Sequence, residues 1–192
     1  MKPSSAALVM VAATIIPSTD AAAQSADPTD SADRTVEIVL VEHLPDEDRG
    51  WCIDAAGHQA NAIMEGGVHG HTCYSYEGKG IAVDQGFSEQ DIAEGRFRLV
   101  EFGHCLTMAI DKPDSWIALT PCDGRAEQNF EITDDGRILA VAGTNLCVTL
   151  GPDLVYGGGG NPIHKIRAAV LDTCSDEKAI YQRWRVRDHR DW

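Results

Sequence analysis

Short runs of β-branched and apolar residues, separated by turn residues, predict an all-β chain. The first run covers residues 35–41, with the sequence TVEIVLV, and such residues favour strands. Further candidate strands follow at short intervals, at residues 97–102, 105–109, 116–120, 130–133, 137–141, 146–150, 167–171 and 184–186. Many short strands at this spacing indicate a sandwich or a barrel.

Two local signals add detail to this pattern. Asp134-Asp135-Gly136 is typical of a hairpin turn. Residues 88–94 are the one stretch with helical character, with Ser88 at the position of an N-cap and Asp91 three residues later. We therefore expect one short helix in a chain of strands.

The first 34 residues are expected to lie outside the folded domain. Lys2 precedes an apolar run at 6–16, and three alanines at 21–23 provide small residues for cleavage. This pattern predicts a signal peptide at 1–23, because the apolar run is shorter than the roughly 20 residues that span a bilayer. Polar residues 24–34 predict a disordered lead-in. The expected domain covers 35–187, with a tail at 188–192.

A threefold repeat organises this domain. Gln85-Gly86-Phe87, Gln128-Asn129-Phe130 and Gln182-Arg183-Trp184 are three motifs of glutamine, any residue and an aromatic residue. A pair of cysteines precedes each motif: Cys52 and Cys73, Cys105 and Cys122, then Cys147 and Cys174. Repetition at a period of about 40–55 residues indicates a repeat architecture or a pseudo-symmetric fold.

The six cysteines are expected to form three disulfides. A signal peptide directs the chain to an oxidising compartment, secreted or periplasmic, where an even number of cysteines favours disulfides. Fifteen pairings exist in principle, and only bridges within each repeat preserve the pseudo-symmetry. We therefore expect Cys52–Cys73, Cys105–Cys122 and Cys147–Cys174. The sequence has no C-x-x-C spacing that would favour a zinc site.

The formal charge of −14 narrows the choice of partners. Removing the signal peptide takes away one lysine and one aspartate, so the charge of the mature chain is unchanged. Such an acidic surface repels phosphates, which argues against nucleic acid and membrane partners. The mature length is that of one domain, and we expect a monomer.

Four strands in each of three repeats match a β-trefoil, in which three hairpins cap a six-stranded barrel. The chain resembles the ricin B-type lectin domains, whose signature is Cys-apolar-Asp, a second cysteine about 20 residues later and Gln-x-Trp. Cys52-Ile53-Asp54 and Gln182-Arg183-Trp184 match this signature, whereas the first two motifs have Phe87 and Phe130 in place of tryptophan. The resemblance covers residues 35–187 and implies that the three aromatic residues are buried in the core.

The resemblance also implies where a sugar would bind. In the first repeat it assigns the carboxylate to Asp54, the polar position to His69, the stacking position to His71 and the polar end of the motif to Asp84 and Gln85. Tyr74 or Tyr76 would supply a further aromatic face. The same positions are Thr107 and Thr120 in the second repeat, and Thr149 and Asp172 in the third. Neither of these repeats has a carboxylate at the position of Asp54 together with an aromatic residue at the stacking position, so at most one intact site is expected.

Other chemistry has little support in the sequence. No hydrolase, zinc-protease or phosphate-loop motif is present, so we expect no enzyme and no cofactor. Three histidines, His58, His69 and His71, have imidazole nitrogens that could bind a metal ion. However, no cysteine or carboxylate at fixed spacing completes such a site. The acidic run at 42–48 lacks the ligand pattern of a calcium loop and predicts a solvated turn. The glycine run at 157–160 predicts a flexible insertion.

The sequence therefore predicts an exported carbohydrate-binding module, with galactose-type sugars among the candidate ligands. The alternative is a degenerate β-trefoil that serves as a protein-interaction or inhibitor scaffold without binding sugar. The fold alone does not choose between them.

Overall fold

The computed structural model describes residues 1, 33–76, 79–188 and 191. The predicted signal peptide and most of the lead-in lie outside these residues. Within them, twelve strands form one connected sheet system, and four strands fall in each sequence repeat. They are β1 (Thr35–Leu40), β2 (Trp51–Ala55), β3 (Val68–Thr72) and β4 (Phe87–Ser88), then β5 (Arg98–Leu99), β6 (His104–Met108), β7 (Ser115–Pro121) and β8 (Phe130–Ile132), then β9 (Ile138–Ala140), β10 (Leu146–Tyr156), β11 (Lys165–Thr173) and β12 (Trp184–Arg187).

Six of these strands close into a barrel, the first and last strands of each repeat. β1 pairs with β4 and with β12, β4 pairs with β5, and β8 pairs with β9, all antiparallel. Two single bridges complete the ring: Arg96–Asn129 lies between β5 and β8, and Arg137–Arg183 lies between β9 and β12. The barrel and its threefold connectivity are those of a β-trefoil, as the sequence predicted.

The middle strands of each repeat form the three capping hairpins, β2–β3, β6–β7 and β10–β11. Each hairpin carries one disulfide: Cys52–Cys73, Cys105–Cys122 and Cys147–Cys174. The bridges inside the repeats are thus confirmed, and all six cysteines are paired. A covalent link closes each hairpin at the end nearest the Gln-x-aromatic motif, so the motif meets a fixed backbone.

The aromatic residues of the three motifs lie in one core. Phe87, Phe130 and Trp184 are at most 1% exposed and belong to the main cluster of buried residues. Phe130 packs edge-on against Phe97, and the indole of Trp184 donates a hydrogen bond to the carbonyl of Val148 at 2.9 Å. A buried indole needs such a partner for its N–H. The prediction that these residues form the core is confirmed.

The local predictions hold in part. The expected helix is α1 (Glu89–Ala93), and the Ser88 hydroxyl accepts a hydrogen bond from the Asp91 N–H at 3.0 Å. The turn before Arg137 also forms as expected, with Gly136 at φ +86°. The strand predicted at 97–102 was too long, because only β5 is extended there. No sequence pattern predicted α2 (Ala179–Gln182) or the 3-10 turns η2 (Gln59–Asn61), η3 (Met64–Gly66) and η5 (Ala126–Gln128).

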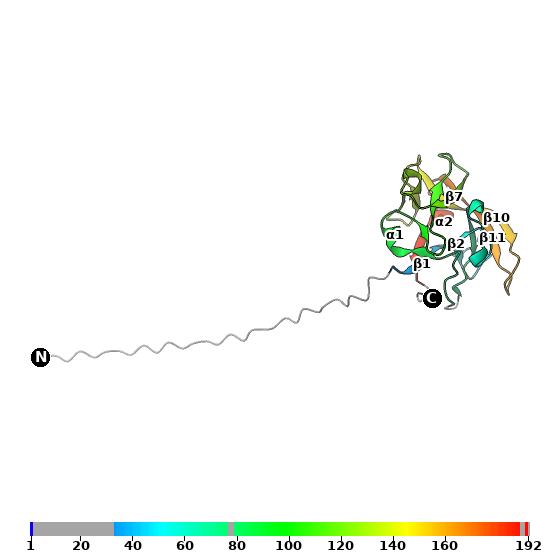
Figure 1. The fold of residues 1–192 in the computed structure, drawn as a ribbon, viewed down its shortest axis with the longest axis horizontal. Coiled ribbons are helices and arrows are strands. Elements are labelled where there is room, and N and C mark those ends of the chain that lie inside the picture. The colour runs from blue at the N-terminus through cyan, green and yellow to red at the C-terminus, as the bar shows by residue number, and fades with distance from the viewer. Residues whose placement is uncertain (2–32, 77–78, 189–190, 192) are drawn as a thin grey trace. The chain divides into compact units, whose positions relative to one another are not determined.

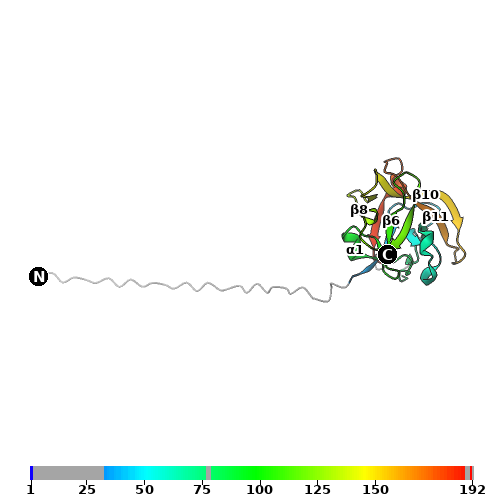
Figure 2. The same ribbon diagram turned by 45° about the horizontal axis from the view of Figure 1, so that its top comes forward.

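The third hairpin breaks the threefold symmetry. β10 and β11 run well beyond the predicted 146–150 and 167–171, to Tyr156 and back from Lys165. In addition, β11 pairs with β3 of the first repeat, with Ile166 opposite His71 and Ala168 opposite His69. In Figure 1 and Figure 2 the hairpin, yellow to orange, lies at the edge of the domain. The third repeat thus extends beside the predicted site of the first.

No helix among the residues that the structure describes is long and apolar enough to cross a membrane.

Candidate functional site

The buried glutamine of each motif clamps the end of the hairpin in its own repeat. Its Oε1 accepts a hydrogen bond from the backbone N–H that follows the second cysteine: Tyr74, Asp123 or Ser175, at 3.0 Å in each case. Its Nε2 donates to the carbonyl that precedes this cysteine: Thr72, Pro121 or Thr173, at 2.9–3.1 Å. All three glutamines are fully buried. This part of the motif is therefore structural in every repeat.

The remaining donor of the glutamine distinguishes the first repeat. Gln85 Nε2 donates to Asp54 Oδ2 at 2.7 Å, whereas Gln182 Nε2 donates to the Thr149 hydroxyl at 2.9 Å. Asp54 lies on β2 and is 1% exposed. Burial raises the pKa of this carboxyl, and the nearby charge of Asp84 raises it further, while the contact with His69 opposes the rise. A buried carboxylate has a free-energy cost that a threonine hydroxyl does not have.

His71 is next to this carboxylate on β3. Its Nδ1 lies 2.8 Å from the Thr72 carbonyl and 3.6 Å from Asp54 Oδ2. A carbonyl only accepts hydrogen bonds, so Nδ1 carries a proton and Nε2 of the neutral ring is left as an acceptor. Burial lowers the pKa of His71, although the Asp54 carboxylate works in the opposite direction. A neutral imidazole at pH 7 can thus accept a hydrogen bond from a ligand hydroxyl.

His69 and Asp84 complete the set of residues predicted from the sequence. His69 Nε2 lies 3.5 Å from Asp54 Oδ1, and its ring stacks parallel to that of His71 with centroids 5.7 Å apart. Asp84 is 1% exposed and accepts a hydrogen bond from the Gln59 backbone N–H. Burial raises the pKa of Asp84, and this hydrogen bond opposes the rise. The structure therefore brings all five predicted residues together.

A pocket of about 570 Å³ lies over His71, and we call it the first-repeat pocket. One side is formed by the loop after β2, the opposite side by the tip of the β10–β11 hairpin. The lining residues are Gly57, His58, Gln59, His71, Tyr74, Gly157, Gly158, Gly159, Gly160, His164 and Ile166. Of the five predicted residues, His71 lines the pocket, while Asp54, His69, Asp84 and Gln85 are outside its lining and support it from behind.

Three rings form the aromatic part of this pocket. His71 and Tyr74 stack with centroids 5.0 Å apart, and the His164 ring stands nearly perpendicular to both, at 5.2 Å and 4.8 Å. Burial raises the pKa of Tyr74 to about 12, so its phenol remains a neutral donor at physiological pH. Burial lowers the pKa of His164, and the charge of Arg49 lowers it further. Flat rings beside neutral polar atoms suit the apolar face and the hydroxyls of a sugar.

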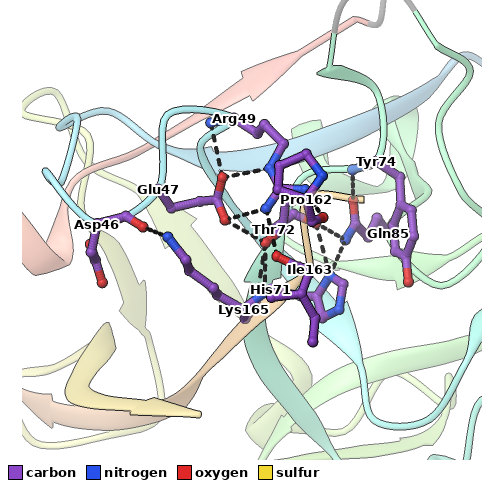
Figure 3. Close-up of polar contacts among 10 residues, drawn as sticks. All are labelled: Asp46, Glu47, Arg49, His71, Thr72, Tyr74, Gln85, Pro162, Ile163 and Lys165. Atoms are coloured by element: carbon purple, nitrogen blue, oxygen red, sulfur yellow. Dashed lines mark hydrogen bonds and ion pairs between the residues drawn. The ribbon is translucent and has the colours of Figure 1, made fainter. Parts of the chain in front are cut away.

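A buried ion pair between Glu47 and Arg49 contacts the tip of the β10–β11 hairpin, as Figure 3 shows. Arg49 donates to the carbonyls of Pro162 and Ile163, both at 2.9 Å. Glu47 holds the guanidinium with bonds of 2.7 Å and 2.8 Å, and it also accepts from the Thr72 hydroxyl at 2.8 Å. Glu47 is 3% exposed, so the prediction of a solvated turn at 42–48 is wrong for this residue. Its partner Arg49 lies just beyond that acidic run.

The other two repeats carry different groups at the equivalent positions. Thr107 and Thr120 bond to each other, with their hydroxyl oxygens 2.8 Å apart. In the third repeat a smaller pocket, of about 330 Å³, is lined by Thr149, Asp172 and Tyr181 among others. Asp172 is held there in an ion pair with Lys178. Tyr181, which the sequence analysis missed, is the aromatic residue directly before the third motif.

The described residues hold no group of three or more His, Cys, Asp or Glu side chains that could bind a metal ion. His69 and His71 stack face to face, so their ring nitrogens do not converge on one point. The metal hypothesis for the histidines thus has no geometric support in this part of the chain.

The sequence analysis also missed two residues of the first-repeat pocket and its support, Arg49 and His164. Arg49 follows an acidic run and His164 follows a glycine-rich segment, and neither residue belongs to a repeated motif. The sole signal is the greater length of the third repeat, whose two cysteines are 27 positions apart, against 21 and 17 positions in the first and second repeats.

No family model matches this sequence, and no curated protein matches it. Similar solved structures do exist. One is a non-toxic homologue of type II RIPs from Momordica charantia (bitter gourd), in complex with α-methyl-D-galactoside, with a TM-score of 0.51 and 17% identity over 80% of this chain and 48% of that chain. Another is the agglutinin from Abrus precatorius, with a TM-score of 0.51 and 16% identity over 82% of this chain and 48% of that one.

The chain thus spans about half the length of these two structures. At this level of identity the likeness shows the fold, a β-trefoil, and the function has to be argued from the site.

Proposed function

We propose that this protein is an exported carbohydrate-binding module with one glycan site, the first-repeat pocket. One observation carries the proposal. The pocket places the stacked His71–Tyr74 pair next to the polar groups of His164 and of the glycine backbone at 157–160, and it lies over the one repeat with a carboxylate behind the stacking position. The likeness to a structure in complex with a galactoside is in keeping with this function.

The roles of the five predicted residues follow from their burial. His71 contacts the sugar directly, because its Nε2 is an acceptor and its ring is part of the pocket lining. Asp54 and Gln85 hold the His71 ring and the end of β3 in place. Asp84 holds the loop of the pocket wall, since its carboxylate accepts a hydrogen bond from the Gln59 backbone N–H. His69 lies against the Asp54 carboxylate and outside the pocket lining. Tyr74 adds the second ring of the stacked pair.

The proposal assigns no catalytic role to the pocket. Its lining contains no carboxylate, and hydrolysis of a glycoside generally needs two that flank the bond.

Isothermal titration calorimetry with galactosides and a wider glycan panel tests this function. Wild-type protein should bind at least one glycan, and His71→Ala and Tyr74→Ala should each weaken that binding about tenfold, a loss of roughly 1.4 kcal/mol. Thr149→Ala in the third repeat is the matched control and should leave the affinity unchanged. If no glycan binds, or if the two pocket variants bind like wild type, the carbohydrate proposal fails.

Asp54 provides a second line of evidence within the same experiment. Asp54→Ala removes the carboxylate behind His71, so we expect at least a tenfold loss of affinity even though the side chain is buried. Asp54→Thr, which copies the residue of the other two repeats, should fold normally and show the same loss. Retained affinity in Asp54→Thr would mean that the carboxylate has no part in binding.

The alternative of a protein-interaction scaffold has one observation in its favour. Asp54, which the resemblance implies as a direct ligand of the sugar, is 1% exposed and already bonded to Gln85. The calorimetric titration separates the two functions, because a scaffold without sugar binding would give no signal with any glycan.

A further inference from the structure

The first-repeat pocket is built from two repeats. The sequence placed a sugar site within the first repeat alone, on β2, β3 and the motif. In the structure β11 is hydrogen-bonded alongside β3, with Arg167 opposite Gly70, and this pairing carries the hairpin tip, residues 157–164, to the open side of the pocket. Five residues of this tip are part of the pocket lining.

The tip is held in a defined shape. Gly157 N–H donates to the His164 carbonyl, and His164 N–H donates to the Gly159 carbonyl, both at 2.8 Å. Gly160 has φ +91°, and a Cβ at this position would lie 2.4 Å from the His164 ring. Glycine is therefore required for the ring to lie where it meets His71 and Tyr74.

The link between the tip and the first repeat is the Glu47–Arg49 pair. Arg49 is 8% exposed and its two hydrogen bonds to the tip end on backbone carbonyls. Thr72, the last residue of β3, joins the same network, because its hydroxyl donates to Glu47 and accepts from the Lys165 N–H at 2.9 Å. The ion pair, the end of β3 and the start of β11 are thus joined in one hydrogen-bond network (Figure 3).

We propose that the hairpin tip 157–164 is the second wall of the glycan site, that His164 contacts the bound sugar, and that Arg49 is the positioning residue that holds this wall. The inference rests on the proposed function and adds to it a ligand geometry. The ligand is a sugar ring that packs against the stacked His71–Tyr74 pair, with its hydroxyls toward His71 Nε2, His164 and the glycine backbone.

The test uses a double variant, Glu47→Gln with Arg49→Met, because removing Arg49 alone would leave a buried carboxylate unpaired. Arg125→Met is the matched control, since Arg125 pairs with Asp123 on the exposed surface of the second repeat. Three quantities are measured: affinity for the best glycan of the panel, amide hydrogen exchange at Gly157 and His164, and the rate at which diethyl pyrocarbonate modifies His71.

We expect the double variant to remain folded, to exchange the tip amides at least tenfold faster, to expose His71 to faster modification and to bind the glycan about tenfold more weakly. His164→Ala should weaken binding without changing the exchange at Gly157, and Arg125→Met should match wild type in all three. The single variant Arg49→Lys, which keeps Glu47, should fall between wild type and the double variant in all three measurements. An ammonium group cannot reproduce the two directed bonds of a guanidinium.

Two results would overturn the inference. If the double variant has a loosened tip but unchanged glycan affinity, the tip is not a wall of the site. If the exchange and the modification rate are unchanged, Arg49 does not hold the tip. The second result is measured without any sugar, so it remains decisive even if wild-type protein binds no glycan and the proposed function itself fails.

Discussion

The first and third repeats have the same clamp and differ in what the clamp holds. In both, a buried glutamine bonds the backbone on either side of the second cysteine. Its last donor meets the Asp54 carboxylate in the first repeat and the Thr149 hydroxyl in the third. The third repeat shows that a hydroxyl is enough for the scaffold. A buried carboxylate with a raised pKa is therefore a feature of the first repeat that the fold does not require.

The largest effect should come from the core that all three repeats share. Trp184→Ala removes a fully buried indole and its bond to Val148, and it should lower the free energy of unfolding by about 3–5 kcal/mol. Trp116, which is 48% exposed on β7, is the matched control, and Trp116→Ala should cost much less. Urea denaturation measures both. Equal costs for the two tryptophans would contradict the assignment of Trp184 to the core.

A smaller effect should separate the two clamps. Gln85→Ala leaves the Asp54 carboxylate without its donor, whereas Gln182→Ala leaves a threonine hydroxyl. Hydrogen bonds to charged groups contribute about 1.5–3 kcal/mol and those between neutral groups about 0.5–1.5 kcal/mol. The loss in unfolding free energy should therefore be greater for Gln85→Ala by about 1 kcal/mol.

Denaturation at pH 7.5 provides this comparison, and the Asp54→Thr background provides its control. In that background the first clamp resembles the third, and Gln85→Ala should cost the same as Gln182→Ala. A difference that persists would show that the carboxylate is not its cause.

The two histidines of the first-repeat pocket should give the protein a pH-dependent stability. The pKa values of His71 and His164 lie below the ordinary 6.5 because the protein partly removes both rings from water, His71 being buried and His164 half-buried. As the pH falls, the histidines of the unfolded chain therefore bind protons before those of the folded protein. The stability that the neutral rings contribute is present above about pH 6.5 and is lost as the pH falls through their folded pKa values. Asp54 and Asp84, whose pKa values are raised, contribute with the opposite sign: their term is lost as the pH rises from 3.8 through their folded values.

Comparison of variants isolates the histidine contribution. Unfolding free energies of wild type and of the His71→Gln, His164→Gln double variant are measured between pH 7.5 and 5. Wild type should lose more stability than the variant as the pH falls, by a few tenths of a kcal/mol or more. His104→Gln, on β6 of the second repeat, is the control and should keep the slope of wild type. Parallel curves for wild type and the pocket variant would contradict this prediction.

The repeated parts of the molecule were the parts that the sequence could predict. The Gln-x-aromatic motif and its cysteines occur three times, so their common spacing indicates pairing and burial that one copy would not. Asp54, His69, His71, Asp84 and Gln85 come together for the same reason, since each lies within one hairpin or motif of the first repeat. How deeply Asp54 is buried was not predictable, because it depends on how closely Gln85, His69 and His71 pack around the carboxylate.

The unique parts of the molecule were not predictable. Arg49 meets Pro162 and Ile163 across more than 110 positions of the sequence, and neither end carries a periodic signal. An acidic run in a sequence predicts exposure to solvent. Glu47 is buried instead, because its partner Arg49 contacts the distant hairpin tip. The glycine run at 157–160 was predicted as a flexible insertion, yet its turn is closed by two backbone hydrogen bonds and forms part of the pocket lining.

The most direct test of the account is a glycan titration followed by NMR with assigned side-chain signals of the histidines and tyrosines. The account predicts that signals of His71, Tyr74 and His164 shift together with one dissociation constant, while those of Tyr181 in the third repeat and His104 in the second stay in place. Shifts at Tyr181 without shifts at His71 would move the site to another repeat, and no shift with any glycan of the panel would contradict a carbohydrate-binding function.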